Sequence, residues 1–224
     1  MMAVDALALR DVIKIYRSGP VETVALRGLT LEAREGELVA LLGPSGCGKS
    51  TVLSLCAGLD DPSAGEVWVG GCHLASLPEA DVDAMRASDL AMVLQSGNLW
   101  SWLSARRNVI TGCQLAGVDD PEQRADEALA AFGLAGRAGI RAGELSGGEQ
   151  QRVAVAAAFA RRPRVVLADE PTGELDSANE RRVLDALVDL RDRSQAAVLV
   201  VTHSERVAET ADRVLEMRDG QLVT

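Results

Sequence analysis

Long apolar runs, a signal-peptide h-region and C-x-x-C cysteine pairs are all missing from this sequence. Its longest uninterrupted apolar run, residues 153–160, has eight residues, well short of the roughly 20 that a membrane-spanning helix needs. The first residues include Asp5, Arg10 and Asp11 and no apolar h-region, so no secretory signal peptide is expected. The four cysteines form no C-x-x-C pair and are expected to be reduced, small apolar residues.

Lysine and net positive charge are also scarce. Lys14 and Lys49 are the only lysines among 23 basic residues, and the formal net charge is -10. This acidic balance argues against a nucleic acid held through its phosphates, so no nucleic-acid partner is expected. An anionic ligand would need a local positive site.

Length and apolar pattern predict a single α/β domain over residues 1–224. The chain is 47% hydrophobic and 25% charged, and it is long enough for one sizeable core. Two continuous apolar runs, residues 164–168 and 196–201, flank a helix-like segment at 178–192. Such all-apolar strands alternating with helices are typical of a buried, mostly parallel sheet.

Two smaller parts are expected around this core. Strand-like runs at residues 7–9, 12–16 and 24–32, broken by turns, predict an antiparallel β subdomain. A mostly helical pattern predicts a helical subdomain inserted in the core at approximately residues 86–162. Near the end, Asp219-Gly220 between two short apolar runs predicts a hairpin on a primed turn.

A glycine-rich loop follows the apolar strand expected at residues 37–42. It has the spacing G-x-x-x-x-G-K-S and is followed by an apolar helical spacing of Val52, Leu55, Cys56 and Leu59. Strand, loop and helix in this order predict a phosphate-binding loop, whereas the alternative is a glycine-rich turn that happens to precede a helix. The loop residues are Gly43, Pro44, Ser45, Gly46, Cys47, Gly48, Lys49, Ser50 and Thr51.

Each part of this loop has an expected role. Its glycines Gly43, Gly46 and Gly48 permit backbone angles that turn successive N–H groups toward an anion. Lys49 is expected to reach the β- and γ-phosphates of a nucleotide, and the Ser50 hydroxyl to hold Mg²⁺.

Two acidic residues end the apolar strand expected at residues 164–168. Asp169 is placed to hold Mg²⁺, and Glu170 is placed to accept a proton from an attacking water. An ordinary charged strand end is the alternative, but the phosphate-binding loop upstream favours the catalytic interpretation.

Leu145-Ser146-Gly147-Gly148-Glu149 opens the next expected helix. Ser146 and Glu149 have the S-x-x-E spacing of a capping box. The Gly-Gly start also leaves bare N–H groups that can bind an anion, so the structural and the functional interpretation are compatible.

Together, with Gln150-Gln151-Arg152-Val153 extending the last motif, these segments resemble the ATP-binding subunits of ABC transporters over nearly the whole chain. The resemblance implies a phosphate-loop NTPase fold, ATP and Mg²⁺ as ligands, and ATP hydrolysis. It also implies that Ser146 to Glu149 bind the γ-phosphate of ATP held by a second copy, in a head-to-tail homodimer with two nucleotides at the interface.

The same resemblance assigns roles to residues that are uninformative alone. Gln95 matches the glutamine that contacts Mg²⁺ and senses the membrane partner, although a lone Gln is usually a surface residue. Tyr16 matches the aromatic that stacks on adenine, and His203 matches the switch histidine that reaches the γ-phosphate. Residues 174–176 match the loop that contacts the second copy.

Within the family the chain looks most like the ATPases of lipoprotein-release, macrolide-efflux and cell-division permeases. Departures gather near the expected permease surface, where Arg107 replaces a usual Glu. Trp100 and Trp102 also lie there, and subdomain packing and permease docking are equally compatible with them. The function implied is a cytoplasmic ATPase, peripheral on the inner face of the cell membrane, that drives a separately encoded permease. The alternative is a soluble ABC ATPase acting on DNA or ribosomes.

Overall fold

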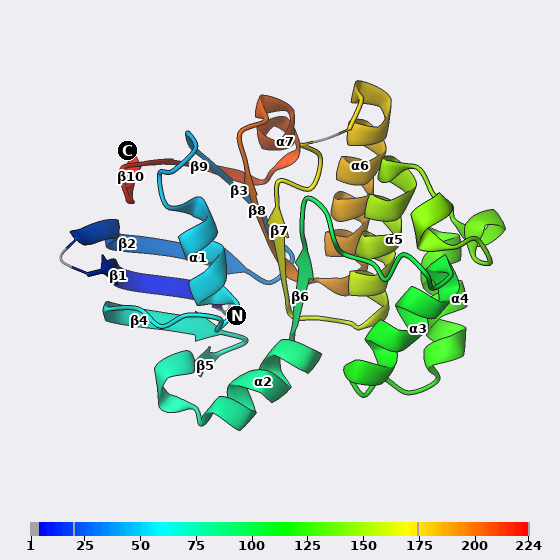
Figure 1. Ribbon diagram of the computed structural model, residues 1–224, viewed down its shortest axis with the longest axis horizontal. Helices are drawn as coiled ribbons and strands as arrows, with labels where there is room; N and C mark the ends of the chain where they lie inside the picture. Colours follow the sequence, from blue (N-terminus) through cyan, green and yellow to red (C-terminus); the bar gives the residue numbers. More distant parts are fainter. Residues whose placement is uncertain (1–4, 20, 174, 224) are drawn as a thin grey trace.

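The computed structural model describes residues 5–19, 21–173 and 175–223 and contains two β-sheets beside a lobe of helices (Figure 1). The antiparallel sheet has the strand order β2-β1-β4-β5, and the core sheet has the order β10-β9-β3-β8-β7-β6. Within the core sheet only β10 pairs antiparallel, so the predicted α/β class with a mostly parallel sheet is confirmed. The strands are β1 (Asp5–Ser18), β2 (Val21–Arg34), β3 (Leu38–Leu42), β4 (Ala64–Val69), β5 (Cys72–His73), β6 (Leu90–Val93), β7 (Val165–Asp169), β8 (Ala197–Thr202), β9 (Arg213–Arg218) and β10 (Gln221–Val223).

Seven α-helices lie in the described part of the chain. They are α1 (Lys49–Cys56), α2 (Glu79–Ser88), α3 (Ala105–Leu115), α4 (Pro121–Ala131), α5 (Gly147–Ala160), α6 (Ser177–Ser194) and α7 (Glu205–Thr210). In that part, none of the helices combines the length and the apolar character required to cross a bilayer.

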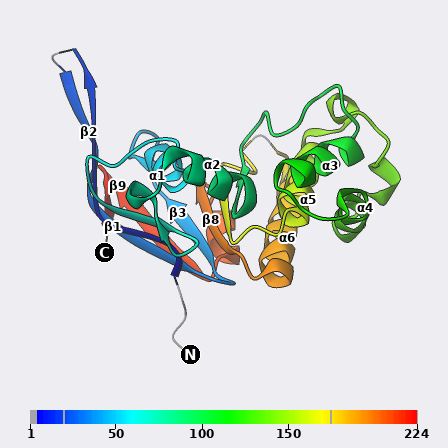
Figure 2. The same ribbon diagram turned by 90° about the horizontal axis from the view of Figure 1, so that it is seen from below.

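Alternate residues of the core strands belong to two different hydrophobic clusters. On β3, Val39 and Leu41 pack with α1 and the antiparallel sheet, whereas Leu38 and Ala40 pack with the helical lobe. Successive strand residues point to opposite faces, so a sheet covered on both faces needs the continuous apolar runs seen in the sequence. Figure 2 shows this layering, with α1 on one side of the sheet and α5 and α6 on the other.

Two strands that the sequence predicts separately are parts of a single strand. The runs at residues 7–9 and 12–16 both belong to β1, which continues through a bulge between Leu9 and Val12. Asp11 adopts the left-handed region at this bulge, with φ 50°. The polar break in the sequence therefore marks an extra residue in the ladder rather than a turn.

A short strand lies inside the approximate range expected for the helical insertion. Residues 90–93, inside the range 86–162, form β6, which pairs with β7 at the edge of the core sheet. The helical lobe of α3, α4 and α5 begins only after this strand. A four-residue apolar run is too short for its periodicity to separate a strand from a helix.

The predicted C-terminal hairpin is confirmed, and it packs behind the glycine-rich loop. Asp219 and Gly220 join β9 to β10 with φ 49° and 80°, as a primed turn requires. The Gly220 N–H donates to the Cys47 carbonyl at 2.9 Å. A Cβ on Gly220 would lie 2.6 Å from the Ala25 carbonyl oxygen, so close packing as well as the turn requires glycine here.

Candidate functional site

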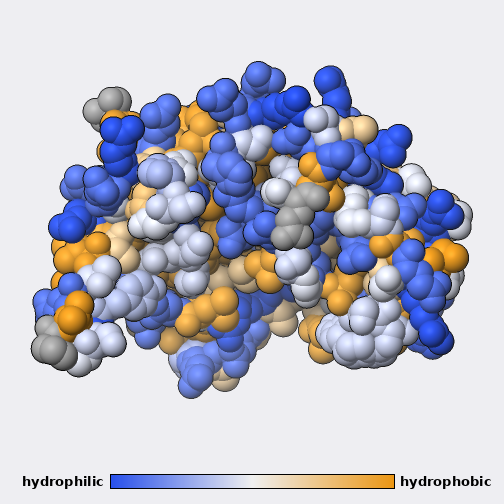
Figure 3. Space-filling model, turned by 45° about the horizontal axis from the view of Figure 1, so that its top comes forward, coloured by the Kyte–Doolittle hydropathy of each residue, from blue (hydrophilic) through white to orange (hydrophobic). Residues whose placement is uncertain are grey.

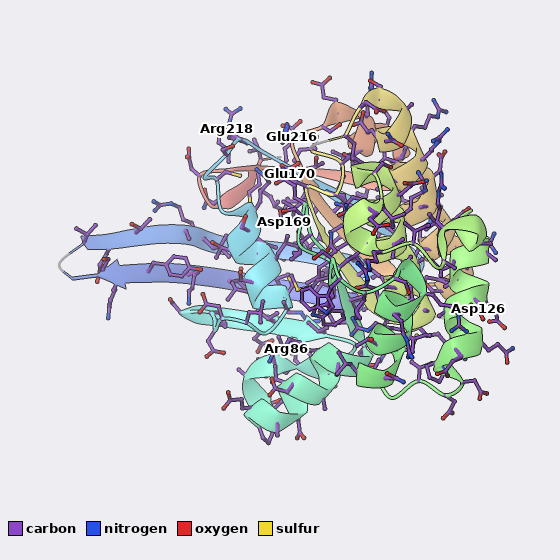
Figure 4. All side chains as sticks on the ribbon, turned by 45° about the vertical axis from the view of Figure 1, so that its right-hand side comes forward. Arg86, Asp126, Asp169, Glu170, Glu216 and Arg218 are labelled. Atoms are coloured by element: carbon purple, nitrogen blue, oxygen red, sulfur yellow. The ribbon has the colours of Figure 1, made fainter. Side chains whose placement is uncertain are left out.

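Three neighbouring strands deliver the expected site residues to one edge of the core sheet. The glycine-rich loop follows β3, His203 follows β8, and Asp169 ends β7. β8 lies between β3 and β7, so Asp169 is not on the strand next to the loop. In parallel strands the carboxyl ends share one edge, and ligands of open α/β sheets bind outside that edge. Figure 4 shows Asp169 and Glu170 there, side by side, and Figure 3 shows a mostly hydrophilic surface on this side of the molecule.

The three loop glycines serve two different needs. Gly46 and Gly48 have φ 80° and 112°, which side-chain-bearing residues rarely adopt. Gly43, by contrast, has no positive φ, which corrects the role expected from the sequence. A Cβ there would lie 2.4 Å from the Met217 carbonyl oxygen and 2.7 Å from the Cys47 sulfur, so Gly43 permits close approach of β9.

The helix after the loop is shorter than its apolar spacing predicts. α1 starts at Lys49, and Val52, Leu55 and Cys56 are buried as expected. The helix ends at Cys56, and Gly58 with φ 60° terminates it in the left-handed conformation. Leu59 is consequently 60% exposed, and its expected place on the buried face is wrong.

The remaining loop residues line the entrance to α1. Pro44, Ser45 and Ser50 are exposed, and Thr51 is half-buried. The first-turn N–H groups of any helix lack partners within it, so α1 presents donors at this end. These donors and the helix dipole favour an anion.

Lys49 places the positive charge of the site under the loop. Its side chain is buried, and its ammonium donates to the carbonyls of Gly43 at 2.6 Å and Pro44 at 3.0 Å. The pKa of Asp169 is raised, first by burial and next by the neighbouring Glu170, while Lys49 opposes both effects. The ligand-free site thus holds two acidic groups and one ammonium close together.

This arrangement predicts that the Asp169 carboxylate destabilises the ligand-free fold. Because the pKa of Asp169 is raised above 3.8, the folded state binds the proton more tightly than the unfolded state does. The free energy of unfolding therefore falls as the pH rises from 3.8 through the folded-state pKa. Asp169→Asn is expected to raise the melting temperature at pH 8 by about 2–4 °C, and by less at pH 4. Scanning calorimetry without nucleotide or Mg²⁺ measures this difference.

The matched control is Asp119→Asn, which neutralises an exposed aspartate before α4. It should leave the melting temperature within about 1 °C at both pH values. An equal gain from both substitutions would mean that net charge, and not the site, sets the effect. A loss of stability from Asp169→Asn would contradict the prediction.

Glu170 is held in a strained and well-defined position. Its backbone has φ 43°, an uncommon conformation for a residue with a side chain. Its carboxylate accepts the buried Thr202 hydroxyl at 2.9 Å, and His203 Nδ1 lies 2.8 Å from its other oxygen. The carboxylate is mostly buried, whereas 72% of the His203 side chain is exposed. Strain of this kind is typical of functional sites.

The oxygen donors expected to hold a metal fit Mg²⁺ chemically. Ser50, Asp169 and Gln95 supply hydroxyl, carboxylate and amide oxygens, which suit a hard cation. Gln95 is exposed, and its side chain lies near Gly173, just beyond the acidic pair. Among the described residues no cluster of three His, Cys, Asp or Glu side chains is suited to a metal.

The capping box predicted at the start of α5 is confirmed. The Ser146 hydroxyl accepts the Glu149 N–H at 3.3 Å, and the Glu149 carboxylate accepts the Ser146 N–H at 3.0 Å. Arg137 also donates to this carboxylate, at 2.8 Å. The backbone bond from Ser146 and the Arg137 contact hold the pKa of Glu149 low, against the effect of burial.

The two glycines of this motif differ in environment. Gly147 is exposed, whereas Gly148 is buried and a Cβ there would lie 2.6 Å from the Asn179 side chain. Asp176 caps α6 by accepting the N–H groups of Ala178 and Asn179. Glu174, part of the loop expected to contact a second copy, lies outside the described residues.

The structure brings together only part of the predicted site. The glycine-rich loop, Asp169, Glu170 and His203 share the carboxyl edge, and Tyr16 lies on β1 in the antiparallel sheet. The Ser146 motif begins α5, and α5 and α1 lie on opposite sides of the central strands in both views (Figures 1 and 2).

Sequence reasoning missed the polar side chain that connects these parts. Gln151 of α5 is buried and donates to the carbonyls of Leu94 at 2.8 Å, Gln95 at 3.0 Å and Pro171 at 3.0 Å. Asn98 donates to its side-chain oxygen at 2.7 Å. Gln151 thus links α5 to the segments after β6 and β7. A Gln on a helix carries no signal of such a role, since Gln is usually exposed.

Trp100 and Trp102 lie in the segment between β6 and α3. Trp102 is 69% exposed, which is incompatible with subdomain core packing for this residue, and Trp100 is 38% exposed. Asn108 fixes the loop by accepting the Trp100 N–H at 2.8 Å. Trp100 and Leu115 line a cavity of about 490 Å³ between α2, α3 and α5. Contiguous exposed apolar patches are typical of partner surfaces, so this region is the candidate docking surface.

A family model described as ABC transporter matches residues 26–173. The chain belongs to the ABC transporter family. It is an ATP-binding and ATP-hydrolysing subunit of that family, so ATP binding and the ATPase activity expected from the sequence are confirmed.

Relatives of this ABC ATPase cover nearly its whole length. It is 42% identical over 220 residues to lipoprotein-releasing system ATP-binding protein LolD 1 of Rhodospirillum rubrum, covering 97% of each chain. It is 44% identical over 223 residues to LolD of Novosphingobium aromaticivorans, covering 99% of this chain and 100% of the relative. Among solved structures, the dimeric cassette MJ0796 bound to ADP and Pi matches with TM-score 0.86 and 34% identity, covering 97% of each chain.

Proposed function

We propose that this ABC ATPase works as an ATP-sandwich homodimer and drives a separately encoded membrane permease. The observation that carries the proposal is the split site. The phosphate loop leads into α1, while the Ser146 motif begins α5, and these two helices lie on opposite sides of the central strands (Figures 1 and 2). Two copies related by a two-fold axis would each complete the other's site. The MJ0796 relative with ADP and Pi is itself a dimer.

In each site the chain's own groups supply binding and proton transfer. The loop N–H groups and Lys49 bind the β- and γ-phosphates of ATP. Glu170 accepts a proton from the attacking water, with Thr202 and His203 orienting its carboxylate through the contacts at 2.9 and 2.8 Å. When bound, Mg²⁺ would be held by Ser50, Asp169 and Gln95 and would neutralise phosphate charge.

The hydrophilic face at the sheet edge supports a dimer that depends on nucleotide (Figure 3). Stable constitutive dimers generally bury larger apolar areas. ATP would supply the missing contacts, because its phosphates meet the loop of one copy and the α5 start of the other.

The proposed permease is of the kind served by lipoprotein-releasing relatives, which share 42–44% identity with this chain. The ATPase would lie in the cytoplasm, peripheral on the inner face of the membrane, through that permease. A net charge of -10 disfavours the alternative of a soluble ATPase acting on DNA or ribosomes. Trp102 is 69% exposed and lies two residues after Trp100, which lines the cavity between α2, α3 and α5, and it is the proposed docking side chain.

Co-purification tests this proposal directly. Tagged protein, purified from detergent-solubilised membranes of its native host, is expected to carry a polytopic membrane protein identified by mass spectrometry. Trp102→Ala should reduce its recovery by at least about tenfold, because truncating a central aromatic in an interface typically costs 2 kcal/mol or more. ATP binding by the isolated subunit should not change.

The matched control is Val21→Ala, which truncates a 60% exposed apolar residue on β2, away from the helical lobe. It should leave recovery of the membrane protein unchanged. Equal losses from both variants would contradict docking through Trp102. Recovery of DNA or ribosomal proteins in place of a membrane protein would overturn the proposed function.

A further inference from the structure

The first of the chain's two lysines lies against the ring of its single tyrosine. Lys14 is 9% exposed, and its ammonium is 4.9 Å from the centre of the Tyr16 ring. All other basic residues apart from Lys49 are arginines.

Asp60 joins both side chains. One of its oxygens accepts the Lys14 ammonium at 2.5 Å, and the other accepts the Tyr16 hydroxyl at 2.9 Å. Lys14 also donates to the Asp61 carbonyl at 2.7 Å. Burial alone would raise the pKa of Asp60, but the bonds from Lys14 and Tyr16 outweigh it and lower the pKa, so the carboxylate stays ionised.

Lysine chemistry suits this arrangement better than arginine chemistry. An ammonium is compact and donates in three directions, so it can take one Asp60 oxygen and a carbonyl while lying over a ring. A guanidinium would favour both carboxylate oxygens at once and would compete with the Tyr16 hydroxyl for one of them.

The Tyr16 ring is thereby fixed at two points. The hydroxyl is anchored to Asp60, and the cation covers one ring face, an attractive arrangement. The ring nevertheless remains 41% exposed. A ring held this way is ordered before a ligand arrives, so binding does not have to immobilise it.

We propose that Lys14 and Asp60 are positioning residues that hold the Tyr16 ring, with one face covered, so that its free face receives the adenine of ATP. The inference rests on the proposed function, in which Tyr16 stacks on adenine. Lys14 and Asp60 themselves act through the ring and not on the phosphates. The effect of substituting Lys14 or Asp60 on ligand binding should therefore depend on whether the ligand has a nucleobase.

Steady-state kinetics of the purified protein separates these possibilities. Lys14→Met and Asp60→Asn are each expected to raise KM for ATP about three- to tenfold with kcat unchanged, as expected when one side chain must be immobilised on binding. Inhibition by magnesium tripolyphosphate, which has the phosphates but no base, should be unaffected. A merely structural role would weaken both ligands alike.

The matched control is Arg17→Met. Arg17 forms an exposed ion pair with Glu22 at 2.9 Å on the same hairpin, next to Tyr16 in sequence. Arg17→Met should change neither KM for ATP nor inhibition by magnesium tripolyphosphate. If Arg17→Met raises KM as much as Lys14→Met, a general charge effect replaces the positioning role.

The single tyrosine provides a second readout that needs no turnover. In protein with ring-labelled tyrosine, ATP should shift the one ring signal, and tripolyphosphate should not. A parent protein whose signal ignores ATP would refute the adenine role of Tyr16 itself. A parent shift with an unchanged KM in Lys14→Met and Asp60→Asn would refute only the positioning role.

Discussion

Glu170→Gln protein is expected to bind ATP with near-normal affinity and to hydrolyse it at least about a hundredfold more slowly. Glutamine keeps the shape of the side chain and can still accept the Thr202 hydroxyl, which donates to the Glu170 carboxylate at 2.9 Å. Its amide, however, cannot take a proton from water. Binding should therefore survive while the chemical step fails.

Blocked hydrolysis should also accumulate the ATP-bound dimer. Light scattering is expected to show a doubled mass for Glu170→Gln with ATP and a monomer or weak dimer without it. Glu209→Gln, which changes an exposed glutamate on α7, is the matched control and should retain parental turnover. A rapidly hydrolysing Glu170→Gln protein would remove Glu170 from the role of base. A monomer with demonstrably bound ATP would contradict the nucleotide-dependent dimer.

The sequence predicted the core because the strongest physical signals were local. The continuous apolar runs of β7 and β8, the strand–loop–helix order around Lys49 and the S-x-x-E spacing at Ser146 all lie within short segments. The apolar runs reflect burial on both faces of the sheet, the strand–loop–helix order reflects phosphate binding, and the S-x-x-E spacing reflects helix capping. These three requirements depend little on distant residues.

What sequence reasoning missed depends on contacts between distant segments. Gly43 is required by β9, which lies far along the chain, and no local pattern shows this. Gln151 donates hydrogen bonds to carbonyls in the segments that follow two different strands. Asp60 pairs with Lys14 across 46 positions. Periodicity and motif spacing carry no information about such pairings, which arise only when the sheets are assembled.

The last prediction tests whether two chains share each site. Lys49→Ala removes the ammonium from the phosphate loop but leaves the α5 start intact. Ser146→Arg leaves the loop intact but places a bulky cation at the exposed N-cap that would face the other copy's nucleotide. Each variant alone is expected to lose at least about 99% of the parental ATPase activity, because every site in either homodimer lacks one half.

Mixing the two variants should restore activity. A mixed dimer contains one site built from the intact loop of the Ser146→Arg chain and the intact α5 start of the Lys49→Ala chain. Its other site has both defects. Activity should therefore appear only in the mixture, rise with protein concentration and reach at most about half of the parental value per dimer. ATPase titrations of one variant into the other measure this.

Loss of the helix cap needs its own control, since the Ser146 hydroxyl accepts the Glu149 N–H. Ser146→Ala shares that loss, about 1 kcal/mol, without introducing a cation. If Ser146→Ala is as inactive as Ser146→Arg, loss of the Ser146 hydroxyl, and not the added cation, explains the defect. If mass measurements show the mixed dimer with ATP bound but without activity, one complete site is insufficient and both must act together. Activity of Ser146→Arg alone at the parental rate would remove the α5 start from the site, since a chain's own loop and Glu170 would then suffice.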